Sequence, residues 1–414
     1  MQGEKILSTP LVAVVVTLAV RFLTYSFKDQ ISLPYHFGIT TPNTGAEIWK
    51  EAVFWKQEFN SVPDYITAVA PWYAEYIPPA PAGVYVTVLC LLDGLTAFIV
   101  SRWPSATPQF VYTLFVLNPA MILLPVLESL APVEHFLLAI IIECSRRQRV
   151  QPWLMNIARL ILPVLGFSFI AVAVALWFPI GTTSPKIALV GALLGAASIG
   201  GCGLLYLRLY GELRAQTSLY APPDNGVMWY VRLLIIPAFE RCMDVFQFQL
   251  PAILTMPLAV ALPADAEAPT APTLERTGVV PGNRRLLVVL FAICVSKACR
   301  CHLALPDYML GVLFLYSLLD KTSRLGQRDG GTSMLERLRT ANVFVPVYTL
   351  LLTVPLQYSF YTGWVMWDTA NPNWVFFPQV AFTIVGGMFV LTFLKAAVEA
   401  ISAEAAAGEK EKQL

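Results

Sequence analysis

The residues best suited to chemistry in this chain are charged side chains inside a hydrophobic stretch, PPDNGVMWYVRLLIIPAFERCMDVFQFQL at 222–250. Its helical part contains Arg232, Glu240, Arg241 and Asp244. Asp244 follows Glu240 by four positions and Arg241 by three, so both pairs can meet on one helix. Charges in hydrophobic segments are costly unless they pair, line a cavity or lie at an interface. The stretch therefore predicts either an internal salt-bridge network that fixes helix packing or a site that faces a partner or a lipid headgroup.

A second polar group lies in the loop GWVMWDTANPNWVFF at 363–377. Its tryptophans fit the aromatic belt of a membrane interface, and they are Trp364, Trp367 and Trp374. Asn371 and Asn373 are neutral donors and acceptors at the level where the phosphates and sugars of a lipid headgroup would lie. The loop is either a headgroup site or a turn built on Asn-Pro chemistry.

Signatures of catalysis are missing from the sequence. It contains no nucleophile elbow, H-E-x-x-H helix, P-loop or dinucleotide fingerprint. Enzymes that use lipid-linked sugars need close carboxylates, yet the D-x-E spacing at Asp265 and Glu267 falls in a Pro/Ala-rich linker. Glu47 and Glu51 are one helical turn apart, a spacing that also describes the solvated face of an amphipathic helix. We therefore expect no catalytic residue and no cofactor.

The cysteines do not predict a metal site. Cys299-Arg300-Cys301-His302 resembles half of one, but no second ligand pair stands at zinc spacing. The odd total of seven cysteines, mostly in apolar runs, also argues against a disulfide framework. We interpret Cys299 and Cys301 as packing thiols or a lipidated pair.

Composition predicts a membrane protein. The 414 residues are 57% hydrophobic and only 13% charged, against about 25% charged in an average soluble domain, and the mean hydropathy is +0.62. The net charge of +1 gives no electrostatic reason to expect nucleic acid. Apolar runs recur along the chain, at 6–25, 82–100, 108–125, 130–143, 156–178, 187–207, 226–240, 244–262, 286–303, 306–320, 341–362 and 374–398. We predict one all-α polytopic domain over 1–414 with about twelve transmembrane or membrane-embedded helices.

Basic residues predict the topology. With this number of spans, clusters such as Arg146-Arg147-Gln-Arg149 all fall on one side, which the positive-inside rule assigns to the cytosol. Both termini, the tail 399–414 and a mobile linker at 263–283 then lie in the cytosol. Residues 27–81 and the loops 126–130, 179–186, 303–306 and 363–373 lie on the luminal or exterior side. The segment 226–262 is either two spans or one plunging segment and one span.

The long loop 27–81 contains one predicted helix. Thr44-Gly-Ala-Glu47 matches a capping box, in which the two side chains satisfy free backbone N–H groups at a helix start. Ile48, Ala52, Trp55 and Phe59 then share one face. This arrangement predicts an amphipathic helix lying on the membrane surface or on a partner.

Five motifs in a fixed order carry a family resemblance. They are Thr41-Pro42 through Trp49-Lys50-Glu51, Val116-Leu117-Asn118-Pro119, Pro223-Asp-Asn225-Gly226-Val-Met-Trp229-Tyr230 leading to Phe239-Glu240, Leu305-Pro306-Asp307-Tyr308 with Leu315-Tyr316, and Thr369 through Phe377. In this order the chain resembles the PIG-U family, the U subunit of the glycosylphosphatidylinositol (GPI) transamidase. It departs from the family pattern in the inserted Asp224, in Asn371-Pro for Asn-Ser and in the longer linker at 263–283.

The resemblance implies a non-catalytic, multi-pass subunit of an endoplasmic-reticulum complex, with a fold similar to lipid-linked-sugar (GT-C type) glycosyltransferases. Such subunits help to recognise the GPI lipid and dock the other subunits, and a caspase-like cysteine protease subunit attaches GPI to proteins. The family's GPI-contacting asparagines fall on Asn371 and Asn373. We expect the remaining lipid contacts from Trp367, Trp374, Asn225, Trp229 and Tyr230, and packing or docking from Arg232, Glu240, Arg241 and Asp244.

Two other classes stay open at this point. One is a GT-C type glycosyltransferase that uses a dolichol-linked sugar, with Asp29 or Glu51 as its base. The other is a transporter, for which paired inverted repeats would be expected; none is visible in the sequence.

Overall fold

The computed structural model describes residues 9–28, 40–41, 44–63, 66, 73–103, 111–147, 153–165, 169–177, 250–261, 283–298, 304, 306–307, 355–356, 359–360, 362–369, 371, 373–374, 376–381 and 384. Every regular element among these residues is a helix, which confirms the predicted all-α class. The predicted segments 187–207 and 226–240 and most of 306–320, 341–362 and 374–398 lie outside them. So do the linker at 263–282 and the tail 399–414.

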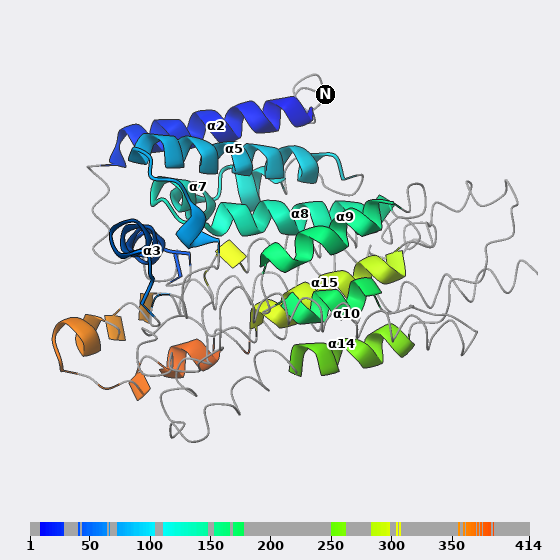
Figure 1. Cartoon of the computed structure of the whole chain (residues 1–414). Helices are drawn as coiled ribbons and strands as arrows, with labels where there is room; N and C mark the ends of the chain where they lie inside the picture. The colour runs from blue at the N-terminus through cyan, green and yellow to red at the C-terminus, as the bar shows by residue number, and fades with distance from the viewer. Residues whose placement is uncertain are drawn as a thin grey trace, which may run out of the picture.

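The long helices lie side by side in one bundle (Figure 1). They are α2 (Pro10–Ser26), α5 (Ala82–Ser101), α8 (Ala131–Arg147), α9 (Leu154–Ile161), α10 (Ile170–Trp177), α14 (Leu250–Ala261) and α15 (Asn283–Ala298). α2 packs on α5 and α5 on α8, while α10, α14 and α15 pack on one another. A continuous hydrophobic core joins the two groups, from Ala97 of α5 to Ile293 of α15.

One helix of the described residues, α5, is long and apolar enough to cross a membrane. The neighbouring pair α7 (Pro119–Val126) and α8 passes the same test when taken together, although the two helices are bent by 119°. The helices α2 and α15 are apolar but shorter. The larger number of spans stays a prediction.

Two predicted apolar segments are broken. Within 108–125, a wide π-helical turn, η3 (Tyr112–Val116), ends before Asn118, and α7 starts at Pro119. Within 156–178, α9 passes into the tight turn η4 (Leu162–Leu165) and α10 begins at Ile170. Proline lacks a backbone N–H and clashes with the preceding turn, which accounts for the breaks beside Pro119 and Pro163.

The loop 27–81 contains the predicted helix as α3 (Ala46–Phe59). The capping box is wrong, because Gly45 is the N-cap residue and no side chain caps the helix. The Thr44 hydroxyl instead pairs with the Thr41 hydroxyl at 2.9 Å and accepts from Ser129 Oγ at 3.2 Å. These contacts tie the start of α3 to the loop before α8.

The inward face of α3 is also shifted from the prediction. Its most buried residues are Trp49 (1% exposed), Ala52 and Val53, which form a second core with Ile66, Ala74, Leu89 and Leu130. Ile48 and Trp55 lie partly buried at the margin, and Phe59 is 58% exposed. The predicted face therefore packs largely against the chain itself. We call the end of the bundle formed by α3, residues 127–130 and residues 304–307 the α3 end.

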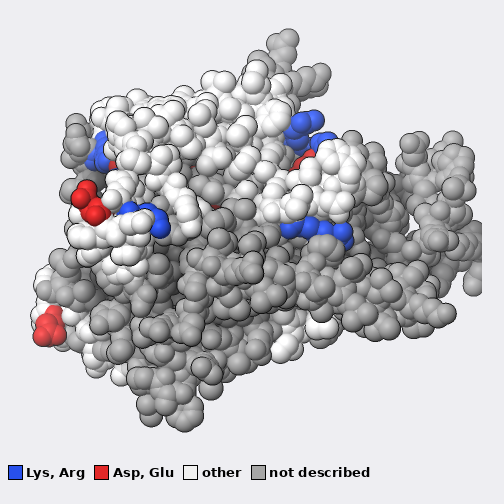
Figure 2. Space-filling view, viewed as in Figure 1, with Lys and Arg blue, Asp and Glu red and all other residues white. Residues whose placement is uncertain are grey.

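The outer surface of α2 and α5 is apolar. Exposed side chains recur at helical spacing on each helix: Leu11, Val15 and Leu23 on α2, and Val84, Val88, Leu91 and Leu95 on α5. Figure 2 shows the described charged side chains of this face gathered at the two ends of the bundle, with uncharged surface over α2 and α5 between them. An apolar stripe bounded by charged ends is the pattern of a surface that faces lipid.

Candidate functional site

A buried ion pair joins α2 to α5. Arg21 and Asp93 are 0% and 1% exposed, and the Nε of Arg21 lies 2.5 Å from Oδ2 of Asp93. The guanidinium also donates to the carbonyls of Thr17 (3.4 Å) and Val116 (3.3 Å) and lies 5.5 Å from the centre of the Phe115 ring. The two opposite charges thus balance inside the bundle, as buried charges require.

The helix break at Asn118-Pro119 explains the contact between Arg21 and the Val116 carbonyl. In a continuous helix the N–H of Ala120 would bond the carbonyl of Val116, four residues earlier. Here the Asn118 side chain accepts from that N–H at 3.0 Å, as an N-cap residue does. The Val116 carbonyl is therefore left for Arg21.

At the α3 end, one carboxylate meets two lysines. Glu128 Oε1 lies 2.8 Å from Nζ of Lys28, and its other oxygen pairs with Lys50. Burial raises the pKa of Glu128, but the two ammonium groups more than offset this and hold it below its usual value. The carboxylate is 4% exposed, whereas the lysines are 40% and 41% exposed. The cluster therefore has one cation in excess, and both cations reach the surface.

The backbone of Glu128 has the conformation that ends α7 and directs the chain toward α3. Its φ of 56° is left-handed, which is uncommon for a residue other than glycine. The N–H of Ser129 bonds the Leu124 carbonyl and that of Glu128 bonds the Pro125 carbonyl, so α7 ends in a Schellman motif. The Glu128 carbonyl then accepts from the indole N–H of Trp49 at 2.9 Å. Glu128 thus fixes α3 against the end of α7.

A cavity of about 290 Å³ opens beside this cluster, between α3 and the start of α5. Its lining is mostly apolar: Trp49, Val53, Pro79, Ala80, Ala82 and Tyr85, with Lys50 as the charged residue. The rings of Trp49 and Tyr85 meet edge to face, 4.9 Å apart. The Tyr85 hydroxyl is held in place by Ala80 N–H and the Pro78 carbonyl. The cavity combines aromatic walls with one ammonium group.

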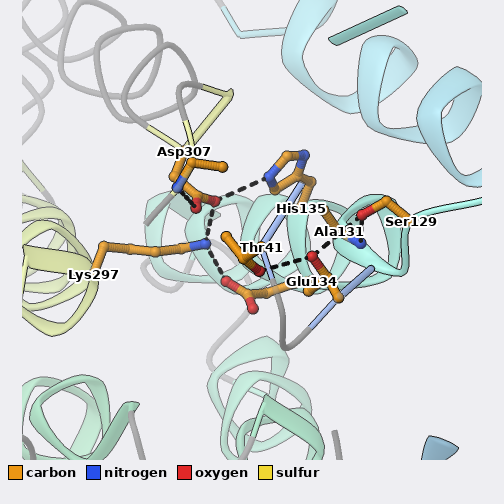
Figure 3. A network of polar contacts seen from close by, with 9 residues as sticks. Thr41, Ser129, Ala131, Glu134, His135, Lys297 and Asp307 are labelled. Carbon is orange, nitrogen blue, oxygen red and sulfur yellow. Dashed lines mark hydrogen bonds and ion pairs between the residues drawn. The ribbon is translucent and has the colours of Figure 1, made fainter. Parts of the chain in front are cut away.

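A second polar network at the α3 end is centred on Lys297 (Figure 3). The ammonium group of Lys297 pairs with Glu134 and, at 2.5 Å, with Oδ1 of Asp307. The same Asp307 oxygen lies 3.4 Å from Nε2 of the fully buried His135, and its second oxygen accepts from the Ala304 N–H at 3.1 Å. The network joins α15, the start of α8 and the loop at 304–307.

The asparagine loop is a compact turn. The N–H of Asn373 bonds Oδ1 of Asn371 at 3.0 Å, and the N–H of Trp374 bonds the Asn371 carbonyl. Before it, the turn η12 (Thr362–Met366) is closed by Thr369, whose N–H and hydroxyl both donate to the Gly363 carbonyl. Both asparagines are exposed. The loop therefore has the predicted turn chemistry and also presents its amides at the surface.

The predicted aromatic belt around this loop is only partly exposed. Trp367 is 69% and Trp374 55% exposed, whereas Trp364 is half-buried. Trp374 packs edge to face on Phe360, with the ring centres 5.5 Å apart. In Figure 1 the loop lies on the same side of the bundle as α3.

The other predicted site residues lie outside the described residues: Asn225, Trp229, Tyr230, Arg232, Glu240, Arg241 and Asp244, together with Asp29, Cys299 and Cys301. Their pairings stay predictions. In the part of the chain that the structure describes, no three His, Cys, Asp or Glu side chains come close enough to hold a metal ion.

Three groups were missed by sequence reasoning: the Arg21–Asp93 pair, the Glu128 cluster and the Lys297 network. A signal for them exists. Asp93 and Arg21 are single charges inside apolar runs, and such charges need partners. The predicted topology also placed 27–81 and 126–130 on one side, and Lys28, Lys50 and Glu128 of these segments meet in one cluster.

Neither a scan against protein-family models nor a search of curated proteins gives a match to this chain.

Proposed function

We propose that this chain is a multi-pass membrane protein of the endoplasmic reticulum and a non-catalytic subunit of GPI transamidase. In this role it recognises the GPI lipid at the α3 end and scaffolds the complex that attaches GPI anchors to proteins. The caspase-like protease of the complex performs the chemistry. A transporter remains the reading with the fewest supporting features, since no paired repeat is visible.

One observation carries the proposal: residues of the resembling motifs occupy the key contacts. Trp49 and Lys50, from the first motif, hold Glu128. Asn118, from the second, releases the carbonyl that Arg21 uses. Asp307, from the fourth, anchors the Lys297 network. Residues of motifs that are far apart in sequence thus make the contacts that join the helices, as expected if the chain shares the fold of the family.

Membrane placement is supported by the surface. The apolar stripes of α2 and α5 have no covering element in the described part of the chain, and the charged side chains lie at the bundle ends. Lipid is the environment in which such a surface costs least.

A scaffolding role is supported by how the buried carboxylates are used. Asp93, Glu128, Glu134 and Asp307 each form an ion pair with Arg or Lys. A general base needs a pKa near the working pH, whereas Lys28 and Lys50 hold the pKa of Glu128 below its usual value. Glu51, the described candidate base of the glycosyltransferase alternative, accepts from Trp55 within α3 at 3.4 Å.

Affinity purification under mild detergent tests the class. We expect the full-length chain to co-isolate a caspase-like cysteine protease and further membrane subunits. Purified chain that instead transfers a sugar from a dolichol-linked donor, with turnover lost in Glu51→Ala or Asp29→Ala, would establish the glycosyltransferase alternative.

Charge changes in the asparagine loop test the lipid site. We expect Asn371→Lys and Asn373→Lys to lower GPI-anchored protein at the cell surface severalfold while the complex still assembles. Asn371→Asp sharpens the test, because it keeps the oxygen that accepts from Asn373 but places a negative charge against the lipid phosphate. Normal display in all three loop variants would exclude this loop as the lipid site.

A further inference from the structure

Three arginines gather at the end of the bundle opposite α3, where α5 and α8 both end. Arg102 directly follows α5, and Arg146 and Arg147 are the last two residues of α8. Figure 2 shows basic side chains at this end as well as at the α3 end. The predicted topology assigns this end to the cytosol, because basic residues beside membrane spans mark the cytosolic side. The arginines therefore lie at the level of the cytosolic lipid headgroups.

One carboxylate serves two of these arginines. Both oxygens of Glu143 accept from Arg146, each at 2.9 Å, and one of them also pairs with Arg147. The indole N–H of Trp103 donates to the same carboxylate at 2.9 Å, which joins the end of α5 to α8. Because one negative charge faces two guanidinium groups, one positive charge is left uncompensated. Arg147 is 37% exposed, so this charge reaches the surface.

Arg102 adds a second uncompensated charge. Its side chain is exposed, and it forms no ion pair with any residue that the structure describes. Its guanidinium lies instead over the ring of Phe98, 5.3 Å from the ring centre. Trp103, the next residue, donates to the carboxylate that pairs with Arg147, so both arginines belong to one junction between α5 and α8. Three guanidinium groups against the single carboxylate of Glu143 leave this junction with two positive charges in excess.

The apolar stripe of α5 leads to Arg102. One face of the helix carries, at spacings of four, three and four positions, Leu91, Leu95, Phe98 and Arg102. Arg102 keeps helical backbone angles (φ −85°, ψ −7°), so this face continues to it. Leu91 and Leu95 are 49% and 47% exposed. At 1.5 Å per residue, Leu91 lies roughly 16 Å from Arg102 along the axis, about half of a hydrocarbon core that is roughly 30 Å thick. One lipid acyl chain can therefore follow the stripe while its phosphate lies at Arg102.

We propose that Arg102 and Arg147 bind the phosphate of an acidic phospholipid in the cytosolic leaflet, and that its acyl chain lies along Leu91 and Leu95. A guanidinium matches phosphate with two parallel N–H groups. The excess charge selects an acidic headgroup, because the ammonium group of a zwitterionic lipid would meet a positive surface. The inference rests on the membrane placement in the proposed function, and its site is at the opposite end of the bundle from α3.

Two charge-removing variants form a matched pair. Arg102→Gln removes a positive charge without breaking an ion pair between described residues. Lys56→Gln removes the same charge from α3, at the other end of the bundle. A general loss of positive charge would affect both variants alike. Arg102→Lys keeps the charge but loses the fork of N–H groups.

The experiment is equilibrium binding of radiolabelled phosphatidylglycerol to the purified full chain in mixed detergent micelles. We expect Arg102→Gln and Arg147→Gln each to weaken binding about fivefold, the effect of one basic side chain beside anionic lipid. Lys56→Gln should weaken it less than about twofold, because its charge lies beyond the screening length, and Arg102→Lys should fall between the two. Equal affinities for Arg102→Gln and Lys56→Gln would overturn the proposal, as would binding that does not weaken when salt is raised.

Competition identifies the source of the phosphate. A phosphodiester of glycerol occurs both in phosphatidylglycerol and in soluble glycerophosphoglycerol. We expect the unlabelled lipid to displace the probe at far lower concentration than the soluble compound, because only the lipid has an acyl chain to place along α5. Equal displacement by the two would contradict the acyl-chain contact. Equal displacement by phosphatidylcholine would contradict the selection of an acidic headgroup.

The result can be separated from the test of the proposed function. Binding that depends on Arg102, in a chain that co-isolates no protease, would leave this site standing and remove the subunit role. Co-isolation of the protease by a chain whose lipid binding is unchanged in Arg102→Gln would remove this site alone.

Discussion

Asp93 and Glu128 are both buried carboxylates held by basic side chains, but their surroundings differ. Asp93 meets one cation, and both partners are almost completely buried. Glu128 meets two cations, each about 40% exposed. The first arrangement is balanced and closed, which suits helix packing. The second reaches the surface through two partly exposed lysines. The two carboxylates therefore differ in the burial of their partners and in the number of cations that they meet, although both form ion pairs.

The largest expected effect is on the closed pair. Asp93→Ala leaves Arg21 charged and without its carboxylate inside the bundle, which costs about 3–5 kcal/mol. Thermal unfolding of the purified chain in detergent measures this as a large fall in the unfolding midpoint. The double variant Arg21→Met with Asp93→Leu removes both charges, and we expect it to recover most of the loss. A double variant as unstable as Asp93→Ala would mean that the pair itself, and not charge balance, holds α2 on α5.

A smaller effect is expected in the Lys297 network. Lys297→Met leaves Glu134 and Asp307 without the ammonium group that pairs with both of them. We expect a loss of about 2–3 kcal/mol, measured by the same unfolding assay. Lys297→Arg keeps the charge and is expected to lose about 1 kcal/mol at most. Equal losses in the two variants would show that packing on Phe169, which lies 5.9 Å from the ammonium group, is the main contribution.

The open cluster is expected to contribute least to stability. Glu128→Gln removes two ion pairs, but their lysines stay hydrated, so we expect a loss of about 1 kcal/mol. A stability loss as large as that of Asp93→Ala would remove the distinction between the two regions.

The pH dependence of that small contribution is a further test. The pKa of Glu128 is lower in the folded chain than the ordinary value of 4.5. Its ion pairs therefore stabilise the fold fully above that value, and the contribution is lost as pH falls through the lower folded pKa. We expect the stability difference between the wild-type chain and Glu128→Gln to be constant between about pH 6 and 7 and to vanish in strong acid. A difference that grows as pH falls would contradict the assignment.

Sequence patterns predicted the helices better than their contacts. The apolar segments expected at 82–100 and 130–143 are the helices Ala82–Ser101 and Ala131–Arg147, because apolar length is a local property. The pairings themselves could not be predicted, since Arg21 and Asp93 are 72 positions apart and His135 and Asp307 172 positions apart. Which distant charges meet depends on tertiary packing, which no local pattern encodes.

The capping box failed for a related reason. Thr44 has the residue type and spacing of an N-cap, but its hydroxyl bonds Thr41 and Ser129 instead. The Thr44 side chain makes a tertiary contact instead of capping the helix, as the capping-box pattern had predicted. The asparagine loop shows the opposite case, because its turn is closed within a few residues and its Asn-Pro chemistry could be predicted directly.

The helix break at Asn118-Pro119 gives Arg21 a backbone acceptor in place of a water molecule. A guanidinium in water is surrounded by oxygen atoms that reorient to it. In the bundle, the carbonyl of Val116 takes that place because Asn118 has removed its usual donor. A backbone carbonyl thus takes the place of water at the Arg21 guanidinium, and one helix is interrupted as a result. A substitution at Asn118 that removes this side-chain acceptor would leave the Ala120 N–H to compete with Arg21 for the Val116 carbonyl.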